Sequence, residues 1–123
     1  MIVMQTNDLD PKIKKLLLAV PKRIDAEWVR ENDKVVIIYK KNFSRLEKFL
    51  HKHLGGPEDV RVVLDDKGTA IWEMCDGNTN IKDICTKLDE KYKEEIEPVF
   101  PRTWKFLEML IDRNLIRLEV PED

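Results

Sequence analysis

Few side chains in this 123-residue chain could bind a metal ion or attack a substrate. The two histidines, His51 and His53, fall in one expected helix, where residues two apart point about 200° apart and cannot share a metal ion. The two cysteines, Cys75 and Cys85, fall on the apolar faces of neighbouring expected helices. That placement favours buried thiols over a redox pair, so we expect no metal site and no cofactor.

A catalytic constellation is not evident either. The four glycines lack the spacing of a phosphate-binding loop. The acidic stretch 94–97 is typical of a solvated loop rather than of a cation site. An enzyme of this size would need an acid, a base and a nucleophile that converge, or a cofactor cradle. We therefore expect that the chain is not an enzyme.

Charge and hydropathy exclude two further classes. With 22 Lys and Arg against 24 Asp and Glu, the net charge of −2 argues against a chain that binds nucleic acid through a large basic excess. The longest apolar run, Leu16 to Val20, is too short to cross a bilayer, and no signal-peptide core is evident. Two cysteines fit a reducing compartment. These features favour a cytoplasmic protein with no membrane partner.

Periodicity and turn signals predict the elements that must position any site. A β-hairpin is expected because the β-branched and aromatic run Val35–Tyr39 follows a tight Asn32-Asp33 turn. Asn80, with Asp83 three residues later, predicts the start of a helix. The expected helices are 11–19, 43–54, 66–75, 80–92 and a last one from Pro98 or Pro101 to about Asn114; the expected strands are 26–31, 34–40, 60–64 and a closing strand at 116–120.

From Val60 onward the sequence resembles the family of coenzyme PQQ biosynthesis protein D, the PqqD-like proteins. The resemblance is carried by a strand that ends in Leu64-Asp65, an Asp76-Gly77 turn between two helices, and the Phe106-Leu107 pair of the last helix. The chain departs from the family in its two extra helices, 11–19 and 43–54. It also has Asn80 where the family usually has Thr.

The resemblance implies an α+β, winged-helix-like fold, with a three-stranded antiparallel sheet packed on a three-helix bundle. Under this interpretation residues 1–123 form one domain. Residues 1–20 are an N-terminal helical extension, and residues 21–123 are the PqqD-like domain with helix 43–54 inserted between strands 2 and 3. In that family the domain is a non-catalytic adaptor. It binds the leader of a ribosomally made precursor peptide as an added strand and presents it to a modifying enzyme, typically a radical SAM protein.

The candidate docking site combines the edge of strand 60–64 with one face of the last helix. Met109, expected to be exposed among cations, suits a peptide with an apolar anchor and acidic residues. Proline at Arg61 or Val63 removes one strand N–H, and one of these two changes is expected to abolish binding. The predicted peptide-binding residues are Arg61, Val62, Val63, Arg102, Lys105, Phe106, Met109 and Arg113.

Two alternatives stay open. A winged-helix DNA-binding regulator would use helix 102–114, although its three cations oppose Glu108 and Asp112 and leave a net charge of only 3 − 2 = +1. A structural subunit would instead pack helices 11–19 and 43–54 against a second copy to form a homodimer. The sequence does not identify the precursor peptide, the enzyme or the product.

Overall fold

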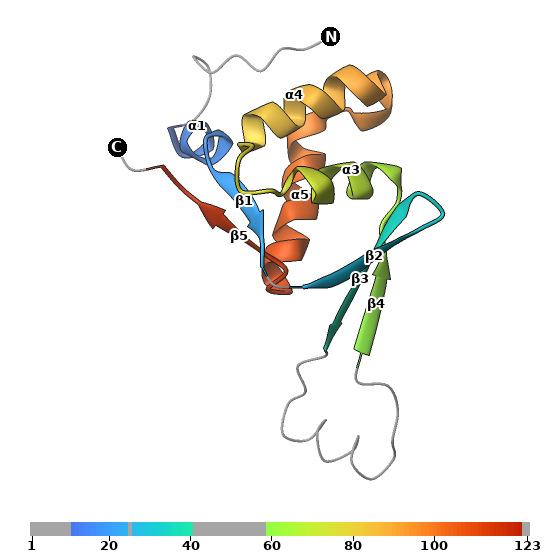
Figure 1. Cartoon of the computed structure of the whole chain (residues 1–123). Coiled ribbons are helices and arrows are strands. Elements are labelled where there is room, and N and C mark those ends of the chain that lie inside the picture. The colour runs from blue at the N-terminus through green and yellow to red at the C-terminus, as the bar shows by residue number, and fades with distance from the viewer. Residues whose placement is uncertain (1–10, 25, 41–58, 122–123) are drawn as a thin grey trace. The chain divides into compact units, whose positions relative to one another are not determined.

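The computed structural model describes residues 11–24, 26–40 and 59–121 (Figure 1). Within these ranges the fold is α+β, as expected. The expected helix 43–54, with His51 and His53, lies outside the described residues. The elements in chain order are α1 (Pro11–Leu17), β1 (Val20–Arg23), β2 (Glu27–Glu31), β3 (Lys34–Lys40), β4 (Asp59–Val63), α3 (Asp66–Met74), α4 (Ile81–Tyr92), the 3-10 helix η2 (Lys93–Ile96), α5 (Val99–Asp112) and β5 (Ile116–Glu119).

The elements belong to two compact units. Residues Ala26–Asp65 form one, which we call the sheet unit. The residues before and after that range form the other, which we call the helical unit. The packing of the sheet on the helices, the winged-helix arrangement and the single-domain boundaries stay predictions.

The sheet unit is an antiparallel sheet in the order β2-β3-β4. Asn32 and Asp33 have φ angles of 54° and 65°, the positive values that a type I′ hairpin turn requires at both central positions. The predicted hairpin is therefore confirmed. Val35, Val36 and Ile37 of β3 are buried, because this is the central strand.

In the helical unit, α3, α4 and α5 surround a core of large apolar side chains. Figure 1 shows α4 lying across one end of α5. The predicted cap of α4 is confirmed: the Asn80 side chain accepts a hydrogen bond of 2.8 Å from the backbone N–H of Asp83. Both cysteines are buried, as expected. The largest fully buried side chains here include Trp72, Leu17, Ile81, Ile84, Leu88, Leu107, Leu110 and Ile116.

A second, two-stranded sheet pairs β1 with β5 in antiparallel register, Val20 opposite Glu119 and Arg23 opposite Ile116. The closing strand was expected, whereas β1 was not predicted from its residues. The other edge of β1 bonds to the turn after α3: the Arg23 N–H donates to the Cys75 carbonyl, and the Gly77 N–H donates to the Pro21 carbonyl, both at 3.0 Å. Thus β1 is held on both sides.

The acidic stretch 94–97 differs from the expectation of a solvated loop. Residues Lys93–Ile96 form a 3-10 helix, and the Ile96 side chain is buried while its glutamate neighbours are exposed. One apolar residue thus anchors an otherwise polar segment. No helix among the described residues is long and apolar enough to span a membrane.

Candidate functional site

Strand β4 is an edge strand, since its only strand neighbour in the described sheet is β3. Val62 lies opposite Ile37, and the Leu64 N–H donates to the Val35 carbonyl at 2.8 Å. Backbone bonding alternates along an antiparallel strand. The N–H and C=O groups of Val60, Val62 and Leu64 therefore face β3, and those of Arg61 and Val63 face outward.

This parity corrects one expectation. Only one of Arg61 and Val63 was expected to present its N–H outward. Residues two apart in a strand share the same side of the ladder, so both do. The predicted contact residue Val62 differs from them, because its backbone groups are used within the sheet.

The side chains of Arg61 and Val63 share one face of the sheet. Val63 is 65% exposed and Val29 on the same face is 39% exposed, whereas Val36 between them is buried, so the exposed apolar surface of this face lies on the two outer strands. The Arg61 guanidinium donates to the Glu31 carboxylate at 2.9 Å, with both side chains about half exposed. Such an exposed pair contributes little to stability and can be replaced by a ligand carboxylate at small cost.

Helix α5 carries the other half of the predicted site. Its buried side chains are Thr103, Leu107 and Leu110, which lie on the side expected to be core. Arg102, Lys105 and Arg113 are exposed, as expected for the opposite side. Phe106, placed at the border of the two sides, is half-buried.

Met109 is half-buried, so the expectation of an exposed methionine is only partly correct. Two of the three neighbouring cations also have partners. Arg102 donates to the Glu95 carbonyl at 3.1 Å, and Arg113 donates to the Met109 carbonyl at 3.3 Å. The latter bond satisfies a carbonyl of the last helical turn, where cations are favoured. Both guanidinium groups keep their charge and have further N–H donors, but these bonds restrict where the two side chains lie.

The predicted site residues lie in both units. Arg61, Val62 and Val63 belong to the sheet unit, whereas Arg102, Lys105, Phe106, Met109 and Arg113 belong to the helical unit. Those of the sheet unit lie on β4, and those of the helical unit lie on α5 except Arg113, which follows it as the C-cap residue. The joining of the β4 edge and the α5 face into a single site stays a prediction.

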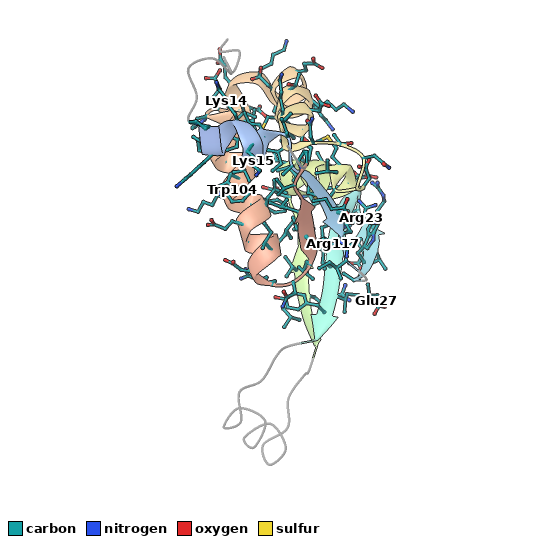
Figure 2. The ribbon with its side chains drawn as sticks, turned by 90° about the vertical axis from the view of Figure 1, so that its left-hand side faces the viewer. Lys14, Lys15, Arg23, Glu27, Trp104 and Arg117 are labelled. Atoms are coloured by element: carbon teal, nitrogen blue, oxygen red, sulfur yellow. The ribbon has the colours of Figure 1, made fainter. Side chains whose placement is uncertain are left out.

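Arg23 is a half-buried residue whose contacts were not predicted from the sequence. Its guanidinium donates to the Trp72 carbonyl at 2.7 Å and to the Glu73 carbonyl at 3.2 Å, and it lies 5.9 Å from the centre of the Trp72 ring. These carbonyls belong to the last turn of α3, so Arg23 on β1 caps a helix about 50 residues away (Figure 2). No local pattern in the sequence predicts this contact.

The cysteines have the chemistry of buried apolar groups. Burial raises the pKa of Cys75 to about 12 and that of Cys85 to about 11. Thiolates are the reactive form, so both thiols are inert at neutral pH. Within the described ranges, no group of three His, Cys, Asp or Glu side chains is arranged to hold a metal ion.

The raised thiol pKa values predict a loss of stability at alkaline pH. A group whose pKa is higher in the folded state contributes stability below its unfolded pKa, near 9, and loses it as pH rises toward the folded value. Between pH 8 and pH 10 we expect each thiol to lower the free energy of unfolding by roughly 1 kcal/mol. Urea unfolding of the wild type and of a Cys75→Ala/Cys85→Ala variant at both pH values measures this difference.

The comparison with the double variant cancels the ionisation of lysines and tyrosines, which both proteins share. Equal pH dependence in the two proteins would contradict the prediction. Native-state labelling with iodoacetamide at pH 7.5 provides an independent control, because both thiols should stay unmodified until the chain unfolds.

Comparison with known proteins identifies one family. The sequence model described as coenzyme PQQ synthesis protein D (PqqD) matches residues 56–116. No curated protein and no solved structure matches the chain. The matched segment contains β4, α3, α4 and α5, and with them all the predicted site residues.

Proposed function

Because the chain belongs to the PqqD-like family, we propose that it is a non-catalytic adaptor for a ribosomally made precursor peptide in a PQQ-type biosynthetic pathway. The leader of that peptide adds as a strand to the outer edge of β4. The adaptor then presents the peptide to a modifying enzyme of the radical SAM type.

The outward edge of β4 is the observation that carries this proposal. Strand addition needs unpaired N–H and C=O groups on an edge, and pockets or surfaces that select the peptide side chains. Arg61 and Val63 supply the backbone groups, as the register with β3 shows. The exposed Val63 side chain and the Arg61 guanidinium supply an apolar contact and a charge next to them.

The α5 face supplies the second contact in this proposal. Phe106 and Met109 offer half-buried apolar surface, and Lys105 offers an exposed ammonium. A thioether adapts its shape to different apolar anchors, which suits a peptide groove. A leader with an apolar anchor and acidic neighbours fits this chemistry. The regulator alternative has weaker support, since the three cations at 102, 105 and 113 are opposed by Glu108 and Asp112.

The decisive test replaces one outward N–H. Val63→Pro removes a donor that a peptide strand would use, while the bonds between β3 and β4 stay in place. We expect the dissociation constant for a fluorescein-labelled leader peptide from the same host to rise by about tenfold or more. The reason is that the peptide carbonyl that would accept from the Val63 N–H is left unsatisfied. Fluorescence anisotropy measures this binding, and the thermal midpoint should change little.

Two variants control the test. Val63→Ala keeps the N–H and should retain most of the binding. Val62→Pro removes a donor that bonds to β3, so it should lower the thermal midpoint, unlike Val63→Pro. Unchanged binding by a folded Val63→Pro protein would refute strand addition at β4.

A further inference from the structure

A second unpaired strand edge lies in the helical unit, on β5. Ile24 N–H donates to the Leu115 carbonyl at 3.0 Å, and Lys22 lies opposite Arg117. By the alternation of antiparallel bonding, the backbone groups of residues 115, 117 and 119 face β1. The groups of residues 116, 118 and 120 face away from it.

The opposite edge of β1 supports this assignment. Arg23 and Pro21 direct their backbone groups to residues 75 and 77, so Lys22 and its alternate neighbours must bond to β5. In the described part of the chain β5 has one strand neighbour, β1. Ile116–Glu119 contains no proline and pairs with β1 without a bulge, and no strand among the described residues covers its outer edge.

The sequence of this edge is complementary to itself. In Ile116-Arg117-Leu118-Glu119-Val120, charges of opposite sign flank a central leucine, and β-branched residues lie at both ends. When two copies pair antiparallel about Leu118, Arg117 of each lies opposite Glu119 of the other, and Ile116 lies opposite Val120. Cross-strand pairs of this kind stabilise an antiparallel sheet.

Hydrogen bonding is compatible with the same register, and the opposite charges of Arg117 and Glu119 distinguish it from registers shifted by two residues. With Leu118 opposite Leu118, the outward N–H and C=O groups of Ile116, Leu118 and Val120 meet those of the second copy. Residues that face outward thus pair with residues that face outward, which is the condition for a hydrogen-bonded pair. A register shifted by one residue in one copy would pair outward groups with groups already bonded to β1.

The exposure of the side chains at this edge agrees with a binding surface that the single chain leaves open to a partner. Val120 is 47% exposed, and Leu118 on the same face is half-buried. Arg117 and Glu119 contact each other at 3.5 Å, with side chains 61% and 51% exposed. Both charges are therefore accessible to the strand of a second copy.

We propose that the outer edge of β5 is a homodimer interface, in which two copies pair their β5 strands antiparallel about Leu118. The two β1-β5 sheets then join into one continuous sheet. This interface differs from the homodimer weighed in the sequence analysis, which used helices 11–19 and 43–54. It involves neither β4 nor the α5 face, so it stands independently of the proposed function.

Charge exchange tests this pairing. Arg117→Glu places two carboxylates opposite each other at both pairs, and Glu119→Arg places two cations there. We expect each single variant to raise the dimer dissociation constant by about tenfold or more, as measured by sedimentation velocity at several concentrations. An equimolar mixture of the two variants should form a heterodimer with near wild-type affinity, because each pair is again of opposite charge.

Lys87→Glu on α4 is the matched control, since it makes the same charge change at an exposed position outside β5. It should dimerise as the wild type does. A wild-type chain that is monomeric at every concentration, single variants that dimerise normally, or a mixture that stays monomeric would each overturn the proposal. A monomer whose leader-peptide binding is abolished by Leu118→Pro would assign this edge to a peptide instead.

Discussion

Trp72→Ala is expected to lower the free energy of unfolding by about 3–5 kcal/mol, the range for truncation of a large buried aromatic side chain. Trp72 lies on α3 and is 0% exposed, the largest fully buried side chain among the described residues. Its removal leaves a cavity that the surrounding helices can fill only in part. Urea unfolding, followed by far-UV circular dichroism, measures the effect.

Trp104→Ala provides a control of the same residue type. Trp104 lies on α5 and is half-buried (Figure 2), so less apolar surface returns to water when it is truncated. We expect a smaller loss, about half of that for Trp72 or less. Equal losses at the two positions would contradict the assignment of Trp72 to the centre of the core.

Arg23→Ala is the second large effect, with an expected loss of about 2–3 kcal/mol. Hydrogen bonds to a charged group contribute about 1.5–3 kcal/mol, and removing this guanidinium takes a charged donor from two carbonyls at the end of α3, of which the Trp72 carbonyl keeps its bond from the Cys75 N–H. Contact with the Trp72 ring adds to the loss. Thermal and urea unfolding of the variant both report it.

Lys22→Ala is the matched control for Arg23→Ala. The Lys22 side chain is exposed on the adjacent position of the same strand, so its truncation should change stability by no more than about 0.5 kcal/mol. Arg23→Lys should recover only part of the loss, because an ammonium lacks the planar fork of the guanidinium. Full recovery by lysine would show that charge alone matters.

Both predictions concern the stability of the segment that matches the PqqD model, residues 56–116. The PqqD match begins at residue 56, whereas Arg23 and β1 precede it. Arg23 nevertheless caps α3, and β1 bonds to the turn that follows α3. The residues of β1, Val20–Arg23, are therefore part of the structure that supports α3.

Local signals explain which elements could be predicted from the sequence. The hairpin follows from a β-branched run beside Asn32-Asp33, two residues that tolerate positive φ. The start of α4 follows from Asn80, whose side-chain bond spans three residues. The core side of α5 follows from its helical period. Each of these signals lies within a few residues of the feature it specifies.

Non-local contacts explain what could not be predicted. Strand β1 contains Pro21 and has its partner almost 100 residues away, so neither its composition nor its neighbours indicate a strand. The half-buried position of Met109 and the carbonyl partners of Arg102 and Arg113 also depend on surroundings that a helical wheel does not contain. The family resemblance placed the candidate site on β4 and α5, which stays a prediction, and the register shows which backbone groups of β4 face away from β3.

The antiparallel pairing of β1 and β5 also sets how the chain responds to a pulling force. Val20 and Glu119 face each other, so a force that draws these two residues apart acts at one end of the ladder and across the strands. Its hydrogen bonds are then loaded one after another, as in a zipper, rather than all together as in shear. Tension applied across Val20 and Glu119 is therefore expected to open the pairing of β1 with β5 from that end.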